Sequence, residues 1–302
     1  MSVASATVVE LLDLFYADWI KCAELLELLA HLEGVKRVVR LVADPARRDA
    51  LFSFLSRAAL QYRVSEFGLR TEFSTSLGDT FQRITPLRDP HGDCVLFVGS
   101  PDATAKANAM ELGGADALSC AEAYEYPACC AASYVSLQEG TPWVLPFLRG
   151  IEPAAFFAWR TNKLACLYPP HLTIIPDFFP CSIRCSSASG LASQYEQLLI
   201  DAGLKELRDL IAAELHRPLL FHGGWIYRFE TLERPRTGSH GHVGRVSFIP
   251  LRSSTARPPL RITSLAVAHG AVELVVSGAD GAQETVAADG PLLRFSSQVG
   301  VP

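Results

Sequence analysis

The sequence predicts an α+β protein made of three consecutive regions. Apolar residues recur at helical spacing near the N-terminus and again in the middle of the chain, whereas short β-branched runs separated by Gly, Pro and Asp dominate the C-terminal part. These patterns predict an α/β region over residues 1–100, a helical region over 101–215 that carries the cysteine motifs, and an antiparallel β-module over 216–302. A chain of 302 residues is long enough for one large or two medium domains.

The N-terminal region starts with a predicted helix. Thr7 and Glu10 have the spacing of a capping box, apolar positions continue to Leu29, and Gly34 is a natural stop. The apolar run 94–99 predicts a strand in the middle of a sheet. Between the two, the patterns predict a strand over 35–42, a helix from Asp44 to about Leu60, and strands over 62–69 and 80–87.

The later regions contain fewer helices than strands. Helices are predicted over 102–110 and 191–202, and Gly203 ends the second of them. The run 271–276 lies between turn residues at 269–270 and 278–281, which predicts a hairpin. The other predicted strands cover residues 225–230, 245–251, 260–267 and 292–295.

Composition and charge restrict the classes of function. A formal charge of −5 argues against a general polyanion binder, so nucleic acid is not expected as a partner. The chain has no apolar run of about 18 residues for a membrane span and no basic leader followed by an apolar stretch, which predicts a cytoplasmic protein. Because the cytoplasm keeps thiols reduced, the eight cysteines predict metal binding or catalysis rather than a disulfide framework.

The residues that carry chemistry fall in two short segments, Tyr126-Pro127-Ala128-Cys129-Cys130 and Pro180-Cys181-Ser182-Ile183-Arg184-Cys185. A proline before each cysteine group favours a turn that enters a helix. The positive end of a helix dipole lowers the pKa of a thiol placed there. Cys181 and Cys185 fall on one face if their segment is helical. The sequence therefore predicts one metal or iron–sulfur centre formed by Cys129, Cys130, Cys181 and Cys185.

The positions of the cysteines in the sequence also favour some kinds of metal centre over others. Structural zinc sites usually use Cys-x2-Cys knuckles, and adjacent cysteines do not easily occupy two vertices of one tetrahedron. A larger cluster accepts three cysteines, so we expect an iron–sulfur cluster of the 4Fe–4S type, with zinc as the alternative. Three ligands then come from the four cysteines, and one thiol of the adjacent pair, with Cys130 as the catalytic candidate, is left for chemistry. A metal-free reactive thiol pair and plain buried cysteines are the remaining interpretations.

The same residues resemble a known family. The pattern Tyr-Pro-x-Cys-Cys, followed about 50 residues later by Pro-Cys-Ser-x-x-Cys and then Ser and Ala, is similar to the domain of unknown function 483 of archaeal and bacterial proteins. The similarity covers residues 105 to 205. The family's first segment usually has the form Gly-Tyr-Pro-Pro-Cys-Cys; here Glu125 replaces the glycine and Ala128 the second proline, while every thiol is kept. The resemblance implies a shared cysteine architecture and no particular reaction.

Five further residues are candidates for roles around this centre. His222, which two glycines follow, is a candidate acid–base residue. Arg184 would place a positive charge beside the thiolates. Asn162, Lys163 and His171 lie between the cysteine segments and could bind the carboxylate or phosphate of a substrate. A structural role is the competing interpretation for each of them.

The remaining cysteines, serines and histidines have simpler explanations. Cys22 and Cys94 are expected to pack as small apolar side chains, whereas Cys120 and Cys166 lie nearer the motifs. The serines of the second motif could donate hydrogen bonds to sulfur, and we expect at least one of them to cap a helix; they are Ser182, Ser186, Ser187 and Ser189. His240 and His242 flank a glycine, and a flexible loop is the favoured interpretation over a metal or phosphate contact.

Nucleotide-binding and common hydrolase fingerprints are absent from the sequence. Three functions remain. The first is an enzyme that uses an iron–sulfur or metal centre for non-redox lyase or sulfur-transfer chemistry on a small polar metabolite. The second is a zinc-stabilised binding module, and the third is a thiol redox protein, which the strain of a disulfide between adjacent cysteines disfavours. The enzyme ranks first, with a small-molecule substrate as the expected partner and a homodimer left open.

Overall fold

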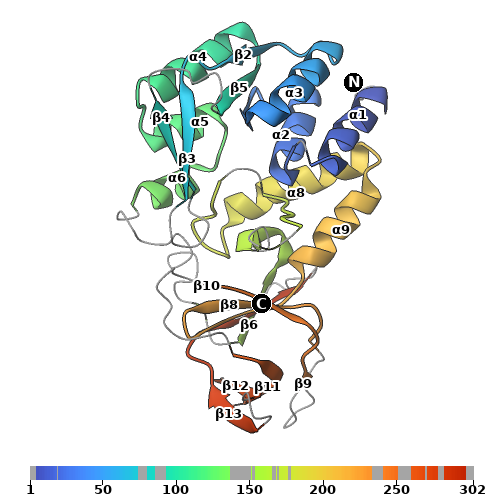
Figure 1. Cartoon of the computed structure of the whole chain (residues 1–302), viewed down its shortest axis with the longest axis vertical. Helices are drawn as coiled ribbons and strands as arrows, with labels where there is room; N and C mark the ends of the chain where they lie inside the picture. The colour runs from blue at the N-terminus through green and yellow to red at the C-terminus, as the bar shows by residue number, and fades with distance from the viewer. Residues whose placement is uncertain are drawn as a thin grey trace.

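The computed structural model describes residues 5–18, 20–73, 80–85, 93–136, 151, 154–164, 168, 170–175, 178–232, 241–250, 260–268, 271–277 and 282–296. It has the α+β architecture that the sequence predicts, with helices and small sheets in one half and the C-terminal sheets at the opposite end (Figure 1). The turns predicted at 269–270 and 278–281, and also Cys166 and His240, lie outside the described residues. Within the described part, no helix is long and apolar enough to cross a membrane.

The predicted N-terminal helix is in fact two helices, α1 (Ser5–Tyr16) and α2 (Cys22–Leu32). They are separated at Asp18, whose φ of 60° is left-handed and cannot continue an α-helix. The capping box predicted at Thr7 and Glu10 is wrong, because α1 already includes both residues in its first two turns. The apolar periodicity continues across the break because both helices bury one face in the same core.

A small antiparallel sheet follows these helices. It consists of β1 (Val38–Ala43), β2 (Tyr62–Val64) and β5 (Cys94–Gly99), with helix α3 (Pro45–Arg57) after β1 and the hairpin of β3 (Gly68–Phe73) and β4 (Thr80–Thr85) after β2. Strand β5 is central and wholly buried, as its apolar run predicts. The predicted strand 62–69 is divided at Ser65, whose hydroxyl donates to the Phe67 carbonyl at 2.8 Å and accepts the Val95 N–H.

Helices dominate the next part of the chain. They are α4 (Pro101–Leu112), α5 (Ala117–Ala123), α6 (Ala128–Val135), the 3-10 helix η1 (Trp159–Thr161), α8 (Ser186–Asp201) and α9 (Lys205–Leu215). Gly203, with φ 77°, follows the end of α8 as predicted. One strand that was not predicted, β6 (Ala154–Ala158), interrupts this part, because Ala-Ala-Phe-Phe-Ala has neither alternation nor β-branched residues.

The C-terminal part forms two sheets. A five-stranded sheet has the order β10 (Val246–Pro250), β8 (Trp225–Phe229), β7 (Leu219–His222), β14 (Leu292–Ser296) and β6, and a four-stranded sheet has the order β13 (Gln283–Ala287), β12 (Ala271–Ser277), β11 (Ile262–Ala268) and β9 (Gly241–His242). The pairings are antiparallel except for β14 with β6, which is parallel. The helical part of the chain thus contributes an edge strand to the C-terminal sheet.

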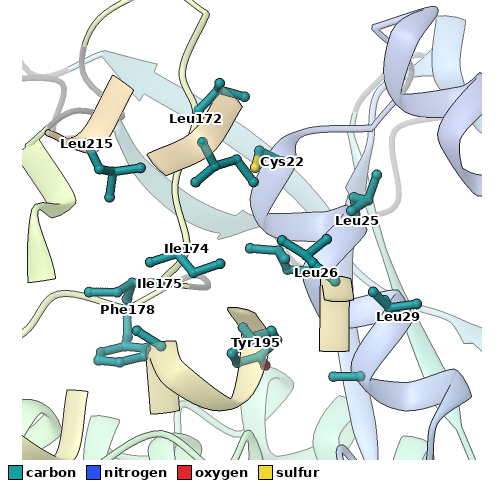
Figure 2. Close-up of a cluster of buried hydrophobic side chains, with 14 of the residues drawn as sticks. Cys22, Leu25, Leu26, Leu29, Leu172, Ile174, Ile175, Phe178, Tyr195 and Leu215 are labelled. Carbon is teal, nitrogen blue, oxygen red and sulfur yellow. The ribbon is translucent and has the colours of Figure 1, made fainter. Parts of the chain in front are cut away.

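The main hydrophobic core lies between the N-terminal helices, α8 and α9, and the segment that leads to the second cysteine motif. Figure 2 shows Leu172, Ile174, Ile175 and Phe178 of this segment together with side chains of α2 and Tyr195 of α8 in this core. The thiol of Cys22 on α2 donates to the Thr173 carbonyl at 3.2 Å. Cys130 and Cys185 belong to the same core. A second core contains residues of both C-terminal sheets, and the five-stranded sheet also contributes side chains of β7, β8 and β14 to the main core.

Candidate metal centre

The first turn of α6 carries the adjacent cysteines. The helix begins directly after Pro127, as the proline predicts, and so places Cys129 and Cys130 beside its free backbone N–H groups. Glu125 enters this turn with a left-handed φ of 58°. The Glu125 carboxylate accepts two hydrogen bonds from Arg37, one from the backbone N–H at 3.0 Å and one from the side-chain Nε at 2.7 Å. The resembled family has glycine at this position, and glycine adopts such a φ without strain.

The second cysteine segment is a turn rather than the start of a helix. The Cys185 N–H donates to the Ser182 carbonyl at 3.1 Å, and the buried Thr161 hydroxyl donates to the Ile183 carbonyl at 2.7 Å. Helix α8 starts only at Ser186, and Cys185 is its N-cap, with Sγ accepting the Ala188 N–H at 3.4 Å. The expectation that a serine caps this helix is therefore wrong, since the thiol sulfur takes that place.

The two segments meet and bring the four predicted cysteines together. The sulfur atoms of Cys129, Cys130, Cys181 and Cys185 all lie within 4.8 Å of one another, an arrangement able to hold a metal ion. Cys129 Sγ is 3.9 Å from Cys130 Sγ and 3.7 Å from Cys185 Sγ, and Cys130 Sγ is 3.6 Å from Cys185 Sγ. Adjacency in the chain therefore does not keep either thiol of the pair out of the cluster.

The four thiols differ in exposure and acidity. Burial strongly raises the pKa of the Cys130 thiol, although the Cys181 backbone N–H that donates to its sulfur at 3.4 Å lowers it in part. Burial and the neighbouring Cys185 raise the pKa of Cys181 to about 11. Cys129 is the exposed member. Partial burial would raise its pKa, but hydrogen bonds with Ser187 and the neighbouring thiols lower it on balance. The site thus has a buried side and a side that solvent reaches.

The other candidate residues lie around or away from this cluster. Asn162 is fully buried and its Nδ2 donates to the Leu215 carbonyl at 2.7 Å, while the buried Lys163 Nζ donates to the Ile175 carbonyl at 2.9 Å. His171 is exposed, with a left-handed φ of 58°. Asn162 and Lys163 are therefore buried residues that bind main-chain carbonyls of α9 and of the segment before the second cysteine motif.

His222 and Arg184 contact groups other than the sulfurs. His222 Nδ1 lies at the end of β7, where it accepts the Asp289 N–H at 3.2 Å and is 3.1 Å from the Asp289 carboxylate. The guanidinium of Arg184 is 5.4 Å from the centre of the Phe157 ring. Cys22 and Cys94 are buried, as predicted for packing residues. Cys120 is half-buried on α5, where its thiol donates to the Ala115 carbonyl at 3.8 Å.

Sequence reasoning missed a buried ion pair close to the first motif. Lys36 Nζ pairs with the Glu27 carboxylate, and the Tyr126 hydroxyl donates to the same carboxylate at 3.2 Å. A signal for Glu27 exists in hindsight, because this charged residue stands within the apolar run Leu25 to Leu29 of α2. No local pattern marks Lys36, which lies in the loop before β1.

Comparisons with protein-family models, curated proteins and solved structures found no match for this chain. The resemblance to the domain of unknown function 483 therefore rests on the cysteine motifs and remains a prediction.

Proposed function

We propose that the chain binds one zinc ion through Cys129, Cys130, Cys181 and Cys185, and that this ion holds the two cysteine segments together. This is the zinc-stabilised binding module, the second of the functions predicted from the sequence. The separation of the sulfur atoms is the observation that carries the proposal. Four thiolates at about 2.3 Å from one tetrahedral ion stand about 3.8 Å from each other, and three of the separations are 3.6, 3.7 and 3.9 Å.

The spacing favours a single ion over a cubic cluster. Each iron of a 4Fe–4S cluster takes one thiolate, so the four sulfurs stand outside a cube and lie further apart than thiolates that share one ion. Such a cluster would require the sulfurs to move apart from their present positions within 4.8 Å of one another. Both members of the adjacent pair are close enough to serve as ligands, which also supports four thiolates rather than three.

The surroundings suit the negative charge of four thiolates around a divalent ion. The sulfurs of Cys130 and Cys185 accept backbone N–H groups, each at 3.4 Å. Cys129 and Cys185 lie at the N-terminal ends of α6 and α8, where helix dipoles stabilise negative charge. N–H donors to sulfur are the usual surroundings of bound thiolates. Thiolate ligands alone make zinc the expected divalent metal in a site without other donor types.

A structural role follows from the number of protein ligands. Catalytic zinc usually has three protein ligands and one open position, whereas four protein ligands close the coordination sphere. The candidate acid–base residue His222 lies at the end of β7, where it pairs with Asp289. The ion would then link the first turn of α6 to the start of α8. Because the site does not exist in the unfolded chain, the free energy of metal binding would add to the stability of the folded state.

Metal analysis of anaerobically purified protein tests this proposal. We expect about one zinc per chain with neither iron nor acid-labile sulfide, and Cys130→Ala and Cys181→Ala should each lose the zinc. Cys120→Ser is the matched control, because Cys120 is a half-buried cysteine outside the cluster, and this variant should keep its zinc. Iron and sulfide in the wild-type protein would instead support the iron–sulfur enzyme. Full retention of zinc in both alanine variants would refute the site.

A further inference from the structure

Tyr126 lies at the junction of the two cysteine segments without being a ligand. It precedes Cys129 by three positions, and its ring packs on Phe178, which precedes Cys181 by three positions. The ring centres are 5.3 Å apart with the planes inclined by 34°. Aromatic pairs at this distance attract each other beyond the simple burial of their area. The contact therefore joins the stretches that lead into both cysteine groups.

The same side chain is tied to a buried ion pair. The Tyr126 hydroxyl donates to Glu27 Oε1 at 3.2 Å, and Lys36 Nζ lies 4.8 Å from the centre of the Tyr126 ring, in position for a cation–π contact. Glu27 pairs with Lys36, and both side chains are almost fully buried, with 2% and 4% exposed. A buried pair of this kind contributes little net stability compared with apolar residues, but it fixes the position of its neighbours strongly.

We propose that Tyr126 is the positioning residue of the four-cysteine site: it holds the two cysteine segments together through Phe178 and anchors them to the Glu27–Lys36 pair on the N-terminal side of the core. This inference rests on the proposed metal binding and names residues that the coordination sphere does not contain. Without the metal ion no coordination bond holds the four sulfur atoms together, so the metal-free segments need other contacts to stay in register. Contacts that keep them in place reduce the ordering cost of metal binding.

The proposal predicts a graded loss of metal affinity. Tyr126→Phe keeps the ring and removes the hydrogen bond to Glu27, and we expect zinc to bind about fivefold more weakly. Tyr126→Leu also removes the aromatic contact with Phe178, and the loss should exceed about tenfold. Tyr168→Phe is the matched control, because Tyr168 is a buried tyrosine whose hydroxyl donates at 2.7 Å to the Ile226 carbonyl of the C-terminal sheet. Its zinc affinity should equal that of the wild type.

The experiment measures zinc affinity by competition with a chromophoric chelator, on full-length variants that circular dichroism shows to be folded. Cobalt(II) absorption provides a second readout, since a loss of structure elsewhere does not change the charge-transfer bands of a tetrahedral thiolate site. A zinc affinity that decreases from the wild type to Tyr126→Phe and further to Tyr126→Leu would support the proposal. Equal affinity of Tyr126→Phe and wild type overturns the anchor to Glu27. Equal affinity of Tyr126→Leu overturns the positioning role while the metal site stands.

Two further outcomes are a variant that does not fold and a wild-type chain that binds no metal, and each has its own interpretation. If Tyr126→Leu does not fold, Tyr126→Phe still decides the anchor to Glu27, and Phe178→Leu decides the contact between the two rings. If the wild-type chain binds neither zinc nor cobalt, the proposed function and this inference both fail. A double-mutant cycle of Tyr126→Leu with Phe178→Leu completes the test. Because the two rings act through one contact, the combined loss of affinity should be smaller than the product of the two single losses.

Discussion

Cys185 has two roles at the level of single residues. Its sulfur lies within 3.7 Å of two other cysteine sulfurs, and the same atom caps α8 by accepting the Ala188 N–H. Cys129 and Cys130 occupy successive positions of one helical turn, and their sulfurs still approach to 3.9 Å. Side chains of the first helical turn and of a tight turn can therefore converge on one ion, although their spacing differs from the usual zinc knuckle.

Cys185→Ser separates these two roles. Serine is a good N-cap, so α8 should keep its first turn, whereas a hydroxyl replaces one thiolate of the site. We expect zinc content to fall well below one per chain and the melting temperature to become insensitive to chelator. The measurement is metal analysis together with calorimetry, with and without chelator. A variant that retains its zinc and its response to chelator would show that Cys185 is not a ligand.

Zinc affinity should rise with pH. Burial raises the pKa of the Cys130 thiol and raises that of Cys181 to about 11, so both carry protons at neutral pH in the metal-free protein and release them on binding. Release of two protons makes the affinity increase by about a hundredfold per pH unit. Competition titrations between about pH 6.5 and about pH 8 measure this slope, and an affinity independent of pH would argue against thiolate coordination.

The raised pKa of Cys181 also makes the stability of the metal-free protein depend on pH, but this stability falls as the pH rises. The folded state holds the Cys181 proton more tightly than the unfolded state, whose thiol has the ordinary pKa of 9.0. The contribution of this thiol to the stability of the metal-free protein is therefore fully present below about pH 9 and is lost as the pH rises towards 11.

At the level of secondary structure, the site depends on where α6 and α8 begin. Pro127 fixes the start of α6, and the turn closed between Ser182 and Cys185 fixes the start of α8. The far end of α8 is fixed by Gly203, whose φ of 77° is unfavourable for residues with a side chain. Gly190, by contrast, lies inside the same helix.

Two glycine substitutions, one inside this helix and one just after its end, should change the free energy of unfolding in opposite directions. A Cβ at Gly203 or at Gly190 would meet no atom within 4 Å, so only the backbone conformation distinguishes them. Gly203→Ala should lower the free energy of unfolding by about 1 kcal/mol. Gly190→Ala should raise it by about 0.5 to 1 kcal/mol, because alanine favours a helix interior. Urea unfolding of the metal-loaded protein measures both, and equal effects of the same sign would contradict this assignment of the helix end.

At the level of the whole molecule, the four cysteines lie at the edge of the main core and not at the C-terminal sheets. Cys130 and Cys185 belong to the core that contains α2, α8 and the segment between Leu172 and Phe178 (Figure 2). The four-stranded C-terminal sheet packs in a second core, whereas the five-stranded sheet contributes residues to both cores. Loss of the ion should therefore loosen one part of the molecule more than the other.

Hydrogen–deuterium exchange can locate this loosening. We expect chelation to increase exchange in α6 and in residues 178–190, since the proposed ion would link these segments. Exchange in β11 and β12 should change little, because their side chains pack in the separate C-terminal core. An increase spread evenly over both cores would mean that the ion stabilises the whole fold rather than the junction of α6 and α8.

Local patterns predict a large part of this fold, and their failures have physical causes. The apolar run of β5, the helix after Asp44, the glycine ends of α2 and α8 and most C-terminal strands follow from periodicity and turn residues. The break at Asp18 could not be predicted, because a left-handed aspartate leaves the apolar periodicity intact. Strand β6 owes its conformation to pairing with β14, a contact between distant parts of the chain.

The four cysteines of the candidate site could be predicted from the sequence, but the residues that hold them in place could not. Proline-led cysteine groups predict a common centre, and the four sulfurs do lie together. The distances between the sulfurs, which decide between one ion and a cluster, depend on the packing of α6 against the turn before α8. Asn162 and Lys163, chosen by sequence position as substrate contacts, are buried and bind main-chain carbonyls. The links from Tyr126 to Glu27 and Lys36 join residues 99 and 90 positions apart, which no local pattern reveals.

X-ray absorption spectroscopy of the zinc-loaded protein tests the central claim most directly, because it counts the sulfur ligands and measures their distances. The proposal predicts four sulfur neighbours at about 2.3 Å and no metal–metal shell. Three or fewer sulfurs with a nitrogen or oxygen neighbour, or an iron–iron shell in protein purified without added zinc, would contradict a closed four-cysteine zinc site.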